Sequence, residues 1–242
     1  MGKVSAISEL NRSDYNEAVD QLDRVICAKD GLDARRSWNR AQELAMLCLT
    51  RDRRNADFRY LLGYIYFKSP SKTEATRRRA KSFLRAAINL DPNHNLARYC
   101  LACLFFDLQR YEPALLELRR LPAEVFREIG QAWRWIKTSE LRLCCSLYIA
   151  PDGSWLDEAE KLSKDYRWFD DPLLAPLPTE LAECLESLLK RRELRDSEMV
   201  QLCEICSSIL IHLGAADLLE ERWPLIHNLL IKHKWRKGVA PY

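Results

Sequence analysis

Nine cysteines and four histidines are the residues of this sequence whose types suit metal binding or nucleophilic chemistry. Two cysteine pairs, Cys100 with Cys103 and Cys203 with Cys206, have the C-x-x-C spacing of zinc ligands. Both pairs fall inside segments with helical apolar periodicity, whereas zinc ligands at this spacing usually lie on turns. We therefore interpret the cysteines as reduced, buried thiols, and we predict no metal site and no cofactor.

The sequence contains no recognisable catalytic motif. Its seven glycines are too far apart for a phosphate-binding loop or a dinucleotide fingerprint, and it has no Gly-x-Ser-x-Gly elbow. The histidines His94, His212, His227 and His233 lack zinc-protease spacing, and His94 follows Pro92 in a turn, where a solvated side chain is expected. We expect a protein that is not an enzyme, although scattered carboxylates could still converge in space.

A basic cluster is the remaining candidate for binding a charged ligand. It consists of Arg77, Arg78, Arg79, Lys81 and Arg85. A second basic run, Lys232–Lys237, contains Trp235, which could stack on a nucleic-acid base. The plain interpretation is a solvated helix face, and the alternative is an acidic protein surface or a nucleic-acid backbone as partner. The formal net charge of +3 is too small to indicate nucleic acid by itself.

Composition favours a folded helical protein. Hydrophobic residues make up 48% and charged residues 30% of the chain, with few glycines and prolines. No apolar segment reaches the roughly 18 residues that a membrane-spanning helix needs, and the first residues do not resemble a secretory signal. We expect a cytoplasmic protein without membrane insertion.

The segment 57–121 organises the chain, because it holds two copies of one helix-turn-helix pattern. The first copy carries Leu62, Gly63, Tyr66, Ala80, Leu84, Ala87 and Pro92, and the second carries Leu101, Ala102, Phe105, Ala114, Leu118 and Leu121. Glycine costs about 1 kcal/mol relative to alanine inside a helix, so Gly63 predicts a neighbouring helix in close approach. Ala102 holds the same place in the second copy, which indicates that smallness is what the position requires.

This pattern resembles the tetratricopeptide repeat (TPR), whose period is about 34 residues. Two units match well, and one or two more are degenerate. The resemblance implies an all-α fold: a right-handed α-solenoid of TPR-like helix-turn-helix units with a C-terminal helical cap. The sequence departs from the family pattern at Arg59 and Arg98, which replace an opening aromatic residue, and in a lengthened turn over residues 68–72.

We expect the solenoid to cover residues 1–169, with units at about 13–53, 55–92 and 95–126 and a degenerate unit at 138–169. A Pro-rich linker is expected at 170–178, followed by the helical cap with its basic tail at 179–242. Cap and turn signals predict helices with these bounds: Ser13–Cys27, Ala123–Lys137, Leu141–Ile149, Thr179–Arg191, Asp196–Leu213 and Ala216–Lys234. Two further helices are predicted from their N-caps alone. One is capped by Ser37, and the other is capped by Ser154 after a turn at Pro151–Gly153.

The resemblance also implies a binding groove, because the first helices of successive TPR units line the concave face. The family's groove positions correspond to Asp57, Tyr60, Tyr64, Phe67 and Lys68 in one unit and to Leu96, Tyr99, Cys103, Phe106 and Asp107 in the next. Aromatic rings supply contact area at low entropic cost, which suits recognition of a peptide or helix. The alternative is that these rings only fill a tightly wound solenoid.

The leading functional hypothesis is therefore an adaptor, scaffold or chaperone that holds a segment of another protein in this groove. The second hypothesis is a nucleic-acid-binding helical-repeat protein that uses the basic patches. A regulatory subunit of a larger enzyme complex is a version of the first hypothesis. A homodimer through the leucine-rich C-terminal helices is a further alternative.

Overall fold

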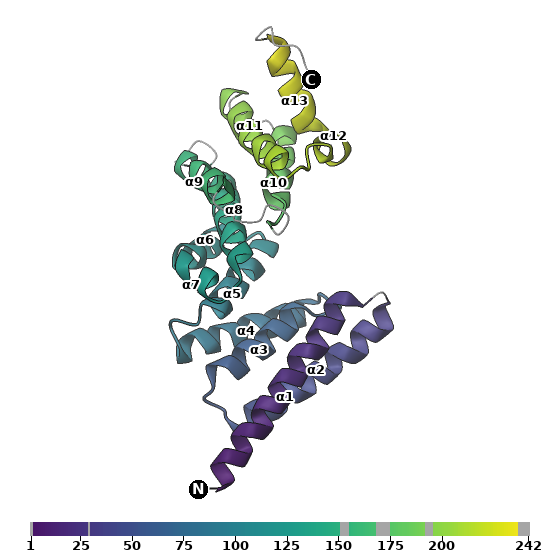
Figure 1. The fold of residues 1–242 in the computed structure, drawn as a ribbon, viewed down its shortest axis with the longest axis vertical. Helices are drawn as coiled ribbons and strands as arrows, with labels where there is room; N and C mark the ends of the chain where they lie inside the picture. The colour runs from purple at the N-terminus through teal and green to yellow at the C-terminus, as the bar shows by residue number, and fades with distance from the viewer. Residues whose placement is uncertain (1, 29, 151–154, 168–174, 192–195, 237–242) are drawn as a thin grey trace. The chain divides into compact units, whose positions relative to one another are not determined.

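A computed structural model describes the chain except for residues 1, 29, 151–154, 168–174, 192–195 and 237–242. The described residues form thirteen helices and no strand. They divide into two compact units, Met1–Arg110 and Tyr111–Tyr242 (Figure 1).

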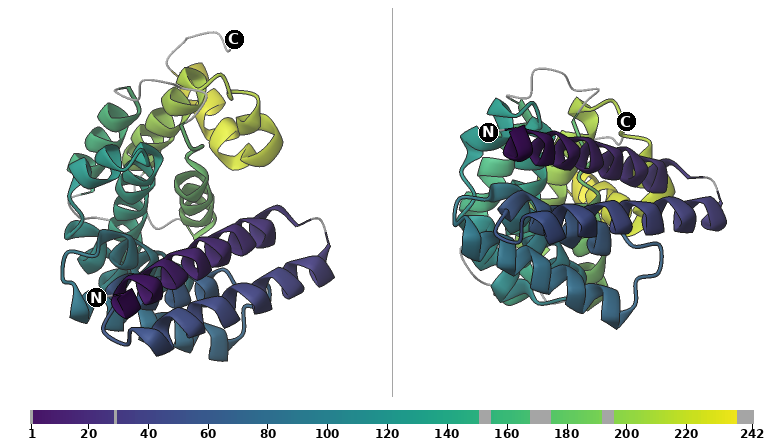
Figure 2. Two further views of the ribbon diagram at one scale, coloured as in Figure 1. Left: turned by 60° about the horizontal axis from the view of Figure 1, so that its bottom comes forward. Right: turned by 90° about the horizontal axis from the view of Figure 1, so that it is seen from below.

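The first unit consists of five helices that pack in sequential order. They are α1 (Gly2–Cys27), α2 (Gly31–Arg51), α3 (Ala56–Phe67), α4 (Glu74–Leu90) and α5 (Asn95–Asp107). The main packing pairs are α1 with α2 and α3 with α4, and α3 also contacts α5. The long α1–α2 hairpin is visible in both views of Figure 2. Helices arranged in this way are stacked pairs, and they place the first helices of the two well-matched units side by side.

Side-chain caps fix where these helices begin. Asp30 accepts hydrogen bonds from the backbone N–H groups of Leu32 and Asp33, at 2.7 and 2.8 Å. Asn55, Thr73 and His94 each accept one backbone N–H three residues ahead, at the starts of α3, α4 and α5. Each cap satisfies one or two of the donors that a helix N-terminus leaves without an intrahelical partner.

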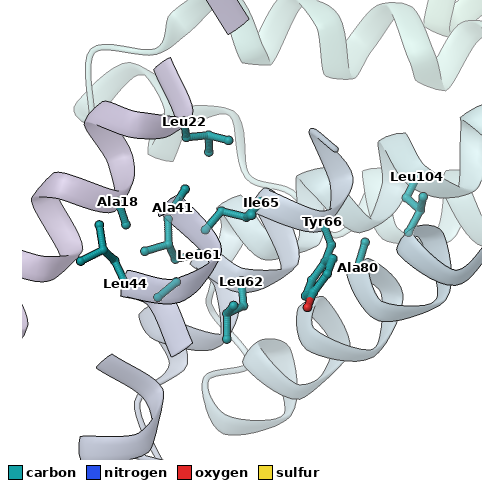
Figure 3. Packing of buried hydrophobic residues seen from close by; sticks show 11 residues of the cluster. Ala18, Leu22, Ala41, Leu44, Leu61, Leu62, Ile65, Tyr66, Ala80 and Leu104 are labelled. Atoms are coloured by element: carbon teal, nitrogen blue, oxygen red, sulfur yellow. The ribbon is translucent and has the colours of Figure 1, made fainter. Parts of the chain in front are cut away.

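Apolar stripes from all five helices form the core of the first unit. Figure 3 shows the cluster running from one helix to the next, and its labelled members are Ala18, Leu22, Ala41, Leu44, Leu61, Leu62, Ile65, Tyr66, Ala80 and Leu104. Gly63 lies against α4, where an added Cβ would be 2.7 Å from Cγ of Leu84. Ala102 is fully buried. The predicted need for a small residue is confirmed at position 63, and Ala102 faces the core.

The second unit consists of α6 (Tyr111–Arg119), α7 (Ala123–Glu128), α8 (Ala132–Ile149), α9 (Leu156–Arg167), α10 (Thr179–Arg191), α11 (Asp196–His212), α12 (Leu218–Arg222) and α13 (Pro224–Arg236). Helix α8 is its centre, because it packs against α6, α7, α9 and α10. Helix α11 packs in turn against α9, α10 and α13.

A buried charged network joins α8 to α10. Glu140 is fully buried, and its Oε1 accepts the backbone N–H of Leu181 at 2.9 Å. Nζ of Lys137 donates to Oε2 of Glu140 at 2.8 Å and also to Glu180. Burial raises the pKa of Glu140 to about 7, although Lys137 acts in the opposite direction. Burial acts to lower the pKa of Lys137, but the two carboxylates more than offset it and raise that pKa.

Several helix boundaries differ from those predicted. Helix α1 starts at Gly2 rather than Ser13, because Asp14 pairs with Arg51 of α2 instead of capping. Helix α2 starts at Gly31 rather than at a cap on Ser37, since the Asp30 side chain already satisfies two backbone donors.

The predicted helix Ala123–Lys137 is also wrong. Helix α7 ends at Glu128, Gly130 adopts a φ of +68°, and α8 then runs unbroken through the expected gap before Leu141. The predicted helix Ala216–Lys234 is interrupted before Pro224, which lacks the N–H that a continuous helix would use.

Other boundaries agree with the prediction. Helix α10 has the predicted bounds, and α11 ends one residue early, at His212, ahead of Gly214 with its φ of +67°. The expected turn at Pro151–Gly153 and the cap at Ser154 lie outside the described residues, as does residue range 170–174 of the expected linker.

Candidate functional site

Three rings and one ammonium group form a continuous line along α3, which we call the ring strip: Tyr60, Tyr64, Phe67 and Lys68. The rings of Tyr60 and Tyr64 are stacked, with centroids 5.8 Å apart and planes at 11°. Tyr64 and Phe67 follow at 6.5 Å and 27°. Nζ of Lys68 lies 5.8 and 5.5 Å from those two ring centroids. The helical spacing of these residues places all four on one side of α3.

The members of the ring strip differ in depth. Tyr60 is only 7% exposed, whereas Tyr64 and Phe67 are half-buried and Lys68 is exposed. Tyr60 therefore belongs to the core, while Tyr64 and Phe67 present part of their ring area at the surface. Their mutual stacking holds each ring in one orientation.

His94 holds the N-terminal end of the strip in place. Its Nδ1 accepts the backbone N–H of Ala97 at 3.2 Å, and its ring centroid is 4.9 Å from that of Tyr60. Its Nε2 lies 3.2 Å from Oδ1 of Asp57, the first of the predicted groove residues. The expectation that His94 is solvated is wrong: the residue is 8% exposed because it serves as the N-cap of α5.

The predicted groove residues of α5 also range from buried to exposed. Tyr99 is 7% exposed, and Leu96, Cys103 and Phe106 are half-buried. Asp107, at the end of α5, is exposed. Because α3 packs against α5, the two predicted sets lie on neighbouring helices of one unit. The side chains of Tyr60 and Tyr99 therefore pack in the interior, and the half-buried residues supply the surface that a partner could contact.

A pocket of about 260 Å³ opens at the C-terminal ends of α3 and α5. It joins Phe67 and Asp107 of the predicted groove to Arg77 of the predicted basic patch. Tyr66, Lys72, Thr76 and Leu104 complete its wall, and none of these four was predicted as a site residue. The sequence signals near them were the lengthened turn between α3 and α4, which contains Lys72, and the basic cluster that begins at Arg77, directly after Thr76.

The predicted basic patch is divided among several sides of α4. Arg78 lies 3.6 Å from Glu74, and Arg79 donates to the hydroxyl of Tyr66 at 3.3 Å. Lys81 and Arg85 lie over the ring of Phe105, on α5. The five cations therefore do not act as one surface. Residues 232–236 of the predicted basic tail belong to α13, and the side chain of Trp235 lies outside the described residues.

The cysteine pairs lie inside helices α5 and α11. All nine cysteines are free thiols, and burial raises the pKa of Cys203 to about 12. Among the described residues, no three or more histidine, cysteine, aspartate or glutamate side chains are placed to hold a metal ion. The described helices also include none that is long and apolar enough to cross a membrane.

Comparison with known proteins identifies a shared fold. No protein-family model and no curated protein sequence matches the chain. A solved structure from work on the functional characterization of Pseudomonas aeruginosa PilF matches with a TM-score of 0.54 and 16% identity. The match covers 97% of this chain and 95% of that one. Together with the described helices, it confirms the predicted fold class, an all-α helical repeat of TPR type.

Proposed function

We propose that this protein is a non-catalytic interaction module, an adaptor or chaperone that holds a peptide or helix of another protein against α3 and α5. The observation that carries the proposal is the stacked pair Tyr64 and Phe67, half-buried and followed directly by the exposed Lys68. The helical-repeat fold supports it, because stacked helix pairs present an extended surface for binding.

The stacking of the rings favours binding. A side chain that is immobilised on binding costs about 0.5–1.5 kcal/mol in lost rotamer freedom. Tyr64 and Phe67 already contact each other and Lys68, so most of their rotamer freedom is lost before a partner binds. An apolar side chain of the partner would then cover the ring area that is still exposed.

The site residues fall into two roles in this proposal. Tyr64, Phe67, Cys103 and Phe106 would contact the partner, and Lys68 and Asp107 would set its register through their charges. Tyr60 and Tyr99 support the surface from beneath, because each is only 7% exposed. We also propose Asp57 and Leu96 as residues of the binding surface.

A peptide-display selection on the full chain tests this role. We expect peptides with apolar residues at helical or alternating spacing to be enriched and to bind the purified protein. The double variant Tyr64→Ala with Phe67→Ala should weaken this binding by about ten-fold or more, since truncating a central ring commonly costs over 1.4 kcal/mol.

Phe83→Ala is the matched control for that variant. Phe83 is also half-buried and stacked, with its ring 5.8 Å from Tyr66, but it belongs to α4. Its removal should leave peptide affinity unchanged. A failure to enrich any peptide, or equal losses in Phe83→Ala and in the double variant, would show that the ring strip is not the binding site.

A further inference from the structure

Three cations of the first unit converge on a single aromatic ring. Nζ of Lys81 lies 5.6 Å from the centroid of Phe105, and the guanidinium carbons of Arg85 and Arg110 lie 5.8 and 5.5 Å from it. Phe105 is 2% exposed, while Arg85 and Arg110 are exposed and Lys81 is half-buried. The ring thus anchors three charged groups at the edge of the surface.

The three positive charges of this cluster lie close together around one ring. Within the described part of the chain, Lys81, Arg85 and Arg110 make no ion pair. Burial lowers the pKa of Lys81, the charges of Arg85 and Arg110 lower it further, and the charge of Glu74 acts in the opposite direction. Lys81 is therefore held close to two charges of its own sign, and a bound anion would offset that repulsion.

The positive charge continues along α4 into the pocket. Arg77, Lys81 and Arg85 are four residues apart, so they lie on one side of the helix and span about 12 Å. Arg77 lines the pocket together with Lys72 and Thr76. Two acidic residues border this stripe: Asp107 in the pocket wall and Glu74 one turn before Arg78.

We propose that Lys81, Arg85 and Arg110, extended by Arg77 and Lys72, form a binding site for the carboxylates of an acidic protein segment. Arginine binds carboxylates through two parallel hydrogen bonds, which favours this type of ligand. Side chains on one face of an extended segment recur every 6.6 to 6.8 Å or so, close to the roughly 6 Å rise between successive cations of the stripe. Glutamate or aspartate at alternate positions would therefore meet successive cations.

Asp107 favours a peptide over nucleic acid as the occupant. A peptide backbone offers N–H groups that can donate to a carboxylate in the pocket wall, whereas the sugar–phosphate backbone of DNA has no N–H donor. The net charge of the whole chain is also only +3, which provides little long-range attraction for a polyanion. The three cations around Phe105 lie outside the ring strip, whereas the pocket that contains Arg77 and Lys72 also contains Phe67 and Asp107.

Fluorescence anisotropy with a labelled octaglutamate peptide tests the site in the full chain. At low salt, roughly 20 mM, we expect saturable binding that weakens strongly at about 200 mM. Replacing all three ring-bound cations (Lys81→Gln, Arg85→Gln, Arg110→Gln) should lower the affinity by about ten-fold or more. A charge-preserving triple variant (Lys81→Arg, Arg85→Lys, Arg110→Lys) should bind more tightly than the neutralised variant, because it keeps the three charges and loses only the paired hydrogen bonds of two arginines.

A second triple variant separates local from overall charge. Arg12→Gln, Arg24→Gln and Arg35→Gln remove the same three charges from exposed positions of α1 and α2. This control should bind octaglutamate as the wild type does. Thermal unfolding of every variant shows whether the protein is still folded.

Three results would overturn the proposal. The first is a lack of octaglutamate binding by the wild type at low salt. The second is an equal loss of affinity in both neutralised triple variants, which would reduce the effect to net charge. The third is tighter binding of a single-stranded oligothymidine with the same dependence on Lys81, Arg85 and Arg110, which would make nucleic acid the occupant.

Discussion

Gly63 of α3 lies directly against Leu84 of α4. A Cβ at position 63 would be 2.7 Å from Cγ, 2.8 Å from Cδ2 and 3.0 Å from the backbone nitrogen of Leu84. Contacts this short do not occur between real atoms of these types, so the two helices are as close as the missing side chain permits. The glycine is thus the residue that lets the first helix of the repeat pack onto the second.

Gly63→Ala should destabilise the first unit. The added methyl gains up to about 1 kcal/mol of helix propensity but forces Leu84 and the α4 backbone to move, and overpacking of this kind costs about 1–3 kcal/mol. We expect a net loss of about 1 kcal/mol in the free energy of unfolding, measured by urea titration. Gly31→Ala is the control, because no atom lies within 4 Å of its added Cβ. A Gly63→Ala protein as stable as the Gly31→Ala protein would contradict this close packing of α3 on α4.

The buried network of Glu140 predicts an unusual pH dependence. The pKa of Glu140 is about 7 in the folded chain against 4.5 for the ordinary carboxyl, so between these values the folded state binds the proton and the unfolded state does not. Stability should therefore fall as the pH rises from about 4.5 to 7, by roughly 1.4 kcal/mol per unit of pKa difference. Below pH 4.5 this contribution is fully present. The measurement is the urea midpoint at a series of pH values, followed by circular dichroism.

Glu140→Gln tests the assignment of that slope. The amide oxygen can still accept the backbone N–H of Leu181, but the group no longer titrates. The slope between pH 4.5 and 7 should therefore disappear in this variant and remain in Glu160→Gln, which alters an exposed carboxylate near Lys164. A slope that persists in Glu140→Gln belongs to another group.

His94 contributes to stability both as a cap and as a ring. His94→Ala should lower the free energy of unfolding by about 1–2 kcal/mol, because α5 loses its N-cap and Tyr60 loses the ring beside it. His94→Asn restores a capping oxygen and should recover about half of that loss. His212→Ala removes an exposed histidine at the end of α11 and should have no effect. Equal stability of the alanine and asparagine variants at position 94 would exclude the capping role.

The sequence predicted the stacking of helix pairs but not the depth of each side chain. Helical spacing places Tyr60 and Tyr64 on one side of α3, yet only the packed structure shows that one is 7% exposed and the other half-buried. Glu140 was missed because a carboxylate in a helix normally faces solvent, and its partners Lys137 and Leu181 come from two helices. The break at Gly130 was missed because a single glycine within an otherwise helical segment is a weak stop signal.

Only part of the pocket could be predicted from the sequence. Phe67 and Asp107 were identified from the repeat pattern, whereas Lys72 and Thr76 come from the lengthened turn and the start of α4. The path of that turn depends on contacts such as the hydrogen bond from the Thr76 hydroxyl to the Ser71 carbonyl, at 3.0 Å. Residue types alone do not specify such a path.

Photo-crosslinking from position 67 tests the central claim most directly. A benzophenone side chain would replace Phe67 in one full-length protein and Phe83 in another, and each would be irradiated with a peptide obtained by display selection. We expect the peptide to become attached from position 67 and not from position 83, because Phe67 belongs to the ring strip and Phe83 lies on α4. Attachment from position 83 at equal yield, or none from position 67, would contradict binding at the ring strip.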